Sequence, residues 1–159
     1  MVAGLSMGGG AAVVWSLRHP DLFGSAALAA PAAFADTPLA APTPGESFPF
    51  GIDDRQFSVD RWTALMSYQR LLAQRGPESP QLRVATVVGD AEVVGDYPSD
   101  SGRSSLTLEA AKLHVALADA PGITSSLRVV GAGHTWDFWV PGLAQAVGLA
   151  RRPAPTDTG

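Results

Sequence analysis

The pattern of apolar and polar residues predicts strands that alternate with helices. Short, continuous apolar runs without polar alternation indicate buried parallel strands, because both faces of such a strand are covered. These runs predict strands at residues 1–5, 24–31, 82–88 and 127–130. The intervening segments predict helices at residues 10–18, 60–74, 107–119 and from 136 or 141 to 149. Strands that alternate with helices predict an α/β fold with a parallel sheet and helices on both faces.

Three segments do not fit this alternation. Residues 32–58 are rich in Pro and Gly and too long for a simple connection, so we expect a lid-like loop or a partly mobile segment. Residues 93–103 predict a polar loop, and residues 151–159 predict a disordered polar tail. The folded domain is therefore expected to occupy residues 1–150. Asp60 is a candidate N-cap for the helix at 60–74.

A Gly-x-Ser-x-Gly motif at residues 4–8 follows the first predicted strand. In the α/β-hydrolase fold this motif forms the nucleophile elbow, a sharp turn between a strand and a helix that exposes the serine, here Ser6. Gly4 and Gly8 are expected to let strand and helix approach closely, because they lack a Cβ atom. The N–H of Met7 would then be the first donor of an oxyanion hole. The alternative is a glycine-rich turn with an incidental serine, but the predicted strand and helix supply the context that the elbow requires.

The order of catalytic residues in this fold is serine, then a carboxylate, then histidine. Here Ser6, a carboxylate near residue 90 and His134 satisfy that order. All three follow predicted strands, and active groups of parallel sheets lie at the carboxyl ends of the strands. His134 would act as general base and then general acid, while the carboxylate would orient its imidazole.

The other two histidines fit a catalytic role less well. His19 comes at the end of the first predicted helix, where a cation interacts favourably with the helix dipole. His114 lies in the middle of the helix at 107–119 and is expected at or near the surface. Neither follows a strand, as His134 does.

The identity of the carboxylate is open at this point. Asp90 and Glu92 both lie on the turn after the strand at 82–88, and their side chains would point in different directions. The one that does not reach His134 is expected to accept hydrogen bonds from nearby N–H groups. Asp137 is a weaker candidate because it follows His134.

At these places the sequence resembles the esterase family that contains feruloyl esterases, acetylxylan esterases, S-formylglutathione hydrolases and mycolyltransferases. The resemblance is carried by residues 4–10, 19–23, 133–136, 139 and 141–143. It looks most like the carbohydrate-esterase branch, in which the histidine loop reads Gly-His-x-Trp and a second Trp follows. In that family the acid follows a Gly-x-x-Asp/Glu pattern, which favours Glu92 after Gly89, although Asp is commoner there.

The resemblance also implies that this chain matches the C-terminal part of a longer esterase domain. In the fold the elbow follows the fifth strand, and a second oxyanion donor comes from a loop after the third. We therefore expect the chain to correspond to the C-terminal part of such a domain. The strand at 1–5 would then have an open edge suited to self-association, and Val13, Val14 and Trp15 would be partly bare.

Composition narrows the class of protein. The chain has 159 residues, 46% of them hydrophobic and 16% charged, with a net charge of −4 and no basic run, so nucleic acid is not an expected partner. There is no cysteine, which excludes disulfides and thiolate metal sites. Its three histidines show no metal-ligand spacing, and no apolar run reaches the roughly 20 residues of a membrane span. Neither a metal nor a cofactor is expected.

Three functions are compatible with these features. The first is a serine esterase that hydrolyses small-molecule or carbohydrate-linked esters through an acyl-enzyme. The second is a mycolyl-type acyltransferase, which would pass the acyl group to a sugar hydroxyl, and the third is an inactive fragment of an esterase. Trp136 and Trp139 could stack on an aromatic acyl group or a sugar, or could pack the histidine loop onto the last helix.

Overall fold

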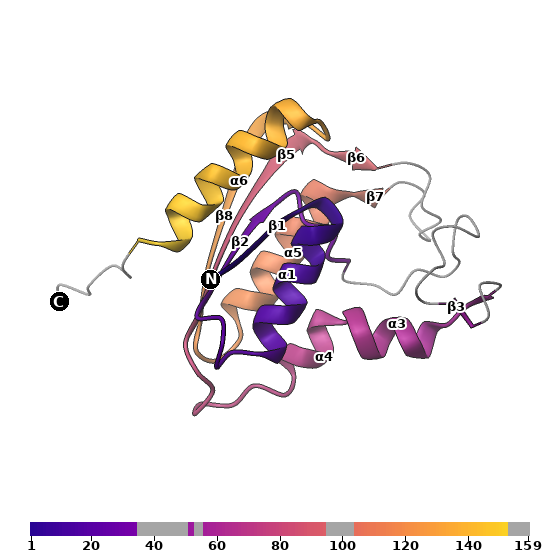
Figure 1. Cartoon of the computed structure of the whole chain (residues 1–159), viewed down its shortest axis with the longest axis vertical. Helices are drawn as coiled ribbons and strands as arrows, with labels where there is room; N and C mark the ends of the chain where they lie inside the picture. The colour runs from indigo at the N-terminus through magenta and orange to yellow at the C-terminus, as the bar shows by residue number, and fades with distance from the viewer. Residues whose placement is uncertain (35–50, 53–55, 95–103, 153–159) are drawn as a thin grey trace.

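The chain forms a four-stranded parallel sheet with helices on both faces (Figure 1). The computed structural model describes residues 1–34, 51–52, 56–94 and 104–152. The sheet order is β1-β2-β5-β8, and its strands are β1 (Val2–Leu5), β2 (Ser25–Ala29), β5 (Leu82–Ala91) and β8 (Ile123–Gly133). Every neighbouring pair in this sheet is parallel. The predicted α/β fold is therefore confirmed.

The helices cover the sheet in two layers. On one face lie α1 (Ser6–Arg18), α5 (Leu106–Ala118) and α4 (Tyr68–Leu72), while α6 (Trp136–Ala150) lies on the other (Figure 1). The central strand β2 shows why its sequence is uniformly apolar. Leu28 belongs to the core beneath α1, and the neighbouring Ala27 belongs to the core beneath α6. Both are fully buried, as expected for a strand covered on both faces.

The helix predicted at 60–74 is in fact two helices. They are α3 (Val59–Met66) and α4, and they are separated at Ser67, whose ψ of 104° is extended. The Ser67 hydroxyl accepts a hydrogen bond from the Arg70 N–H at 3.3 Å and so begins a new helix. The predicted N-cap was wrong: Ser58 caps α3 by accepting from the Arg61 N–H at 3.2 Å.

Two short antiparallel pairs accompany the main sheet. They are β3 (Gly51–Ile52) with β4 (Gln56–Phe57), and β6 (Val93–Val94) with β7 (Ser104–Ser105). Most of the 32–58 excursion, most of the 93–103 loop and residues 153–159 of the tail lie outside the described residues. The expectations of a lid, a mobile segment or a disordered tail therefore stay predictions.

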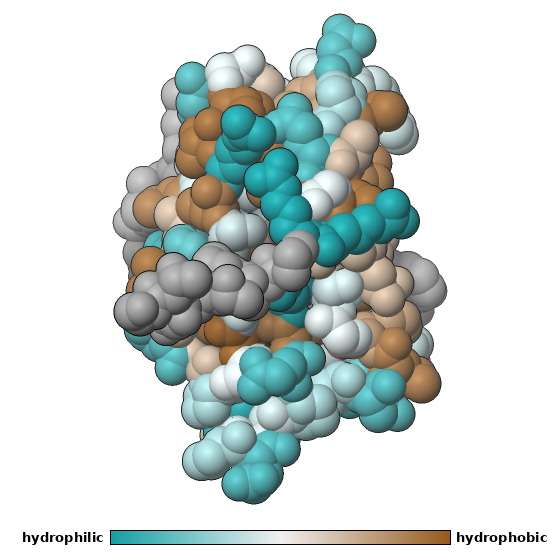
Figure 2. Space-filling view, turned by 90° about the vertical axis from the view of Figure 1, so that its left-hand side faces the viewer, coloured by the Kyte–Doolittle hydropathy of each residue, from teal (hydrophilic) through white to brown (hydrophobic). Residues whose placement is uncertain are grey.

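The helix α1 is covered more completely than expected. Val13 and Val14 are buried, at 0% and 4% exposure, whereas Trp15 is 54% exposed. The Trp15 ring instead lies 5.2 Å from that of His19, the C-cap of α1. On the side of the molecule that carries α6, hydrophobic residues form several separate groups among hydrophilic ones (Figure 2). Within the described ranges, no helix has the length and apolarity needed to cross a membrane.

Candidate active site

The turn between β1 and α1 places Ser6 in a conformation that residues with side chains rarely adopt. Leu5 is still extended, at φ −122° and ψ 150°, and Ser6 follows with a φ of +49°. A positive φ at a residue with a Cβ atom stores backbone strain, which native structures keep mainly at functional sites. The Ser6 carbonyl accepts a hydrogen bond from the Ala32 N–H at 2.9 Å, which helps to hold the turn.

Close backbone contacts explain one glycine of the motif but not the other. A Cβ atom on Gly4 would collide with the backbone carbonyl of Gly8 in the first turns of α1. A Cβ on Gly8 would meet nothing within 4 Å, so the expectation that its missing side chain permits the approach was wrong. It is the bare α carbon of Gly4 that lets the helix begin directly against the strand.

Three side chains far apart in the sequence form one line of hydrogen bonds. Ser6 Oγ lies 3.2 Å from His134 Nε2. His134 Nδ1 lies 2.5 Å from Glu92 Oε2, which is shorter than the distance of about 2.7–2.9 Å usual for a charge-assisted N–H···O hydrogen bond. Ser6 follows β1, Glu92 follows β5 and His134 follows β8, so the carboxyl ends of three parallel strands bring them together.

Glu92 is held from several sides. Its side chain is fully buried, and its second oxygen, Oε1, accepts from the Gly89 N–H at 3.4 Å. Its backbone carbonyl accepts from the Leu106 N–H at 2.9 Å, at the start of α5. Thr107 Oγ1 donates to the Gly89 carbonyl at 2.6 Å. Sequence reasoning missed Thr107, because nothing in the pattern distinguishes it from any other threonine near a helix start.

Asp90, the other candidate carboxylate, has a different partner. Its Oδ1 accepts a hydrogen bond from the Ala132 N–H on β8 at 3.1 Å, and the residue is exposed. It thereby ties β5 to β8 where the pairing of the two strands shifts between Gly89 and Ala91. Asp137 is exposed in the first turn of α6. Among these carboxylates it is Glu92 that bonds to His134.

The backbone beside Ser6 offers a hydrogen-bond donor. Met7 is the second residue of α1, so its N–H has no acceptor within the helix. The helix dipole adds partial positive charge at the same end. The Met7 side chain is 80% exposed and leaves the site.

Two tryptophans lie against the imidazole. The rings of His134 and Trp139 are 4.7 Å apart and nearly perpendicular, at 81°. Trp136 makes a similar contact with Trp139, at 4.8 Å and 76°, and is 66% exposed. Trp139 thus packs on the histidine loop. The remaining histidines lie elsewhere: His19 caps the far end of α1, and His114 Nδ1 is 2.8 Å from Ser125 Oγ between α5 and β8.

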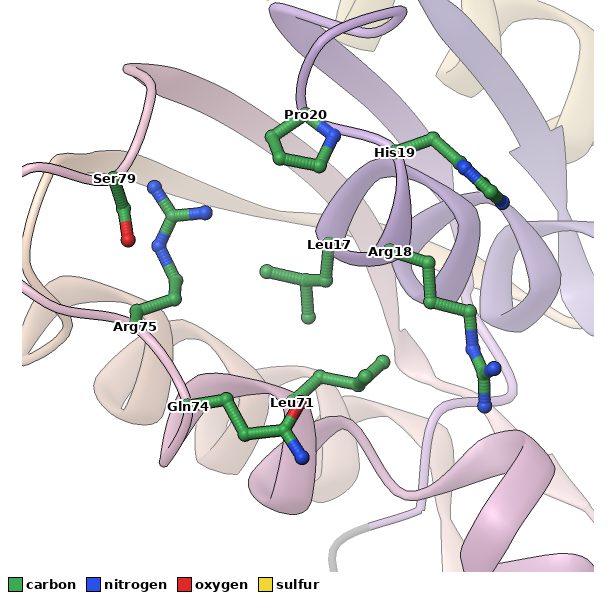
Figure 3. Close-up of a pocket in the computed structure, with 8 residues that line it drawn as sticks. All are labelled: Leu17, Arg18, His19, Pro20, Leu71, Gln74, Arg75 and Ser79. Atoms are coloured by element: carbon green, nitrogen blue, oxygen red, sulfur yellow. The ribbon is translucent and has the colours of Figure 1, made fainter.

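A cavity of about 470 Å³ lies at the opposite end of α1 from Ser6 (Figure 3). It is lined by Leu17, Arg18, His19, Pro20, Leu71, Gln74, Arg75 and Ser79. Its two guanidinium groups hold backbone carbonyls: Arg75 donates to Pro80 at 2.6 Å and Pro121 at 3.1 Å, and Arg18 donates to Ala64 and Leu65. Burial lowers the pKa of Arg75. A 13-residue helix is about 20 Å long, so this cavity is separate from Ser6.

Clusters of possible metal ligands are absent from the described residues. In the part of the chain that the structure describes, His, Asp and Glu nowhere gather in a group of three or more that could hold a metal ion. The groups beside Ser6 are an imidazole, a carboxylate and a backbone N–H donor.

Comparison with known proteins assigns the chain to a family. The family model named Esterase, described as "Putative esterase", matches residues 1–150. The chain belongs to this esterase family. Among curated proteins, none matches the sequence.

Solved structures show the same fold. A ferulic acid esterase matches this chain with a TM-score of 0.57 and 20% identity, over 93% of this chain and 49% of that chain. An S-formylglutathione hydrolase from Agrobacterium tumefaciens matches with a TM-score of 0.57 and 19% identity, over 93% of this chain and 47% of that chain. The chain thus has an α/β-hydrolase fold, and it spans about half the length of these two structures.

Proposed function

We propose that the chain hydrolyses carboxylic esters through an acyl-enzyme formed on Ser6. One observation supports this above all. In a member of an esterase family, a serine on a strained turn lies 3.2 Å from an imidazole that lies 2.5 Å from a buried carboxylate. A serine hydroxyl is a weak nucleophile by itself, and an adjacent base oriented by a third group activates it.

In the first half of the proposed reaction, Ser6 Oγ attacks the ester carbonyl carbon while His134 Nε2 takes the hydroxyl proton. The carbonyl oxygen becomes negatively charged, and the N–H of Met7 donates a hydrogen bond to it. The tetrahedral intermediate then expels the alcohol, which receives the proton from His134. The acyl group remains bonded to Ser6.

In the second half, a water molecule replaces the alcohol. His134 takes a proton from the water, which attacks the acyl carbon, and the carboxylic acid leaves as Ser6 recovers its proton. Through both halves, Glu92 holds the Nδ1–H of His134 and stabilises the imidazolium that forms twice. The buried position of Glu92 keeps this hydrogen bond out of competition with water.

For the substrate, we propose a small-molecule or carbohydrate-linked ester, of the kind that feruloyl-type esterases cleave. The exposed indole of Trp136 supports this, since it lies next to Trp139 and offers a face for an aromatic acyl group or a sugar ring. Acyl transfer to a sugar would use the same acyl-enzyme. Hydrolysis is preferred here because water needs no acceptor site of its own.

Fluorophosphonate labelling tests the proposal directly. The probe should attach to Ser6, located by mass spectrometry, and the Ser6→Ala variant should lose both labelling and hydrolysis of p-nitrophenyl acetate. Ser125→Ala is a matched control, because Ser125 also contacts a histidine but lies outside the elbow. Labelling that survives in Ser6→Ala would overturn the assignment of the nucleophile. Absence of labelling in the unmodified chain would favour an inactive fragment.

We also propose that the chain self-associates through β1. This strand pairs with β2 on one side and ends the described sheet on the other, and an unpaired strand edge is a template for another chain. A charge on an edge strand opposes such pairing, so Ala3→Lys should shift the chain toward monomer in sedimentation velocity experiments. A monomeric unmodified chain at all concentrations would contradict this proposal.

A further inference from the structure

The Trp139 indole lies directly against the imidazole of His134. The ring centroids are 4.7 Å apart at an angle of 81°, within the range of favourable edge-to-face contacts between rings. The imidazole must keep Nε2 near Ser6 and Nδ1 near Glu92 at the same time, so its ring plane has to be fixed. The two hydrogen bonds define two points on that ring, and Trp139 contacts the ring itself.

The backbone explains why this indole reaches back to the histidine. The Thr135 N–H donates to the Gly133 carbonyl at 2.9 Å, which closes a tight turn around His134. The N–H of Trp139 then donates to the Thr135 carbonyl at 3.0 Å, in the first turn of α6. Side chains of a helix tilt toward its N-terminus, so Trp139 projects toward the loop that precedes α6.

No hydrogen bond accounts for the position of the indole. Its Nε1 is buried and has no partner in the described part of the structure. An unsatisfied buried N–H is unfavourable, so the position of Trp139 is determined by packing against the rings of His134 and Trp136 and against the core beneath α6. Removing that N–H while keeping a ring should therefore leave the arrangement intact.

We propose that Trp139 is a positioning residue that holds the His134 imidazole between Ser6 and Glu92. The inference rests on the proposed function, because it assigns Trp139 a part in the same reaction. Trp139 is not itself a catalytic residue. It acts through His134, and the ring rather than the Nε1–H is what matters.

Proton NMR tests this without any need for activity. The Nδ1 proton of His134, in its short hydrogen bond to Glu92, should give a resonance at unusually low field in the unmodified chain. Trp139→Phe should keep that resonance, and Trp139→Ala should broaden or lose it. Trp62→Ala is a matched control, because Trp62 is a buried tryptophan of α3, and the resonance should persist in it.

Kinetics provide the second measurement. Trp139→Ala should lower kcat by about 10- to 100-fold with KM changed by less than about 3-fold, because a misplaced catalytic group slows the chemical step. Trp139→Phe should restore kcat to within about 3-fold of the unmodified chain. Urea denaturation of each variant shows that the rates are compared between folded proteins.

The results separate this inference from the proposed function. If Ser6 is not labelled in the unmodified chain, the proposed function fails, but the low-field resonance still decides whether Trp139 positions His134. Retention of that resonance and of kcat in Trp139→Ala would overturn the inference. An equal loss in Trp62→Ala would do the same, since it would show that general destabilisation explains the effect.

Discussion

Asp90 and Glu92 lie two residues apart, yet their carboxylates bond to different parts of the molecule. Glu92 Oε2 is 2.5 Å from His134 Nδ1, and Asp90 Oδ1 accepts from the Ala132 N–H at 3.1 Å. Glu92 is fully buried while Asp90 is exposed. One carboxylate is thus available to orient the imidazole, and the other joins two strands.

This division predicts that Glu92→Gln and Asp90→Asn have different effects on the rate. Glu92→Gln removes the negative charge that stabilises the imidazolium and no longer fixes its tautomer. We expect kcat for p-nitrophenyl acetate to fall by up to about 10⁴-fold, the loss seen when a triad aspartate is replaced by asparagine. The rate of Ser6 labelling by a fluorophosphonate should fall in parallel.

Asp90→Asn is the control for that loss. The amide oxygen of Asn can still accept from the Ala132 N–H, so the strand contact survives and kcat should stay within about 3-fold. A larger loss of rate in Asp90→Asn than in Glu92→Gln would show that the wrong carboxylate has been assigned.

The sequence alone could predict the central strands β2 and β5 because they are buried on both faces. Leu28 and Val84 lie in continuous apolar runs, and no other arrangement in an α/β chain buries them so completely. Ser6 and His134 could be selected because each follows a predicted strand. The choice between Asp90 and Glu92 could not be made from residues alone, since the register shift of β5 against β8 controls where their side chains point.

Features that depend on contacts between distant segments could not be predicted from the sequence. Thr107 acts on Gly89, 18 residues away, and no local pattern marks that pair. The break at Ser67 was missed because the apolar spacing continues across it. The extended backbone of Ser67 ends α3, and its hydroxyl caps α4. The packing of Trp139 on His134 depends on the tight turn before α6, which periodicity does not describe.

The hydrogen bond from Thr107 to Gly89 gives a second prediction. Thr107→Val keeps the shape but leaves the Gly89 carbonyl without that donor, so we expect a loss of about 1–2 kcal/mol in the free energy of unfolding. Because Gly89 also donates to Glu92, kcat should fall by about 3- to 10-fold. Urea denaturation and steady-state kinetics measure the two effects.

Thr107→Ser checks the reason for that loss. It removes a methyl group but restores the hydroxyl, so it should recover most of the stability and rate. If Thr107→Ser loses as much stability and rate as Thr107→Val, the hydroxyl is not sufficient, and the hydrogen bond to Gly89 does not by itself support the turn before Glu92.

The two glycines of the elbow should respond to the same substitution in opposite ways. In Gly4→Ala the new Cβ collides with the Gly8 carbonyl, and backbone atoms of a strand and a helix cannot move apart cheaply. Overpacking of this kind costs about 1–3 kcal/mol, so the urea midpoint of Gly4→Ala should fall.

In Gly8→Ala the Cβ enters open space within α1, and Ala is favoured over Gly in a helix by about 0.5–1 kcal/mol. The midpoint of Gly8→Ala should therefore rise or stay unchanged. Equal destabilisation by both substitutions would mean that the motif restricts its two glycines by backbone conformation, and that the contact between Gly4 and Gly8 does not determine how closely α1 follows β1.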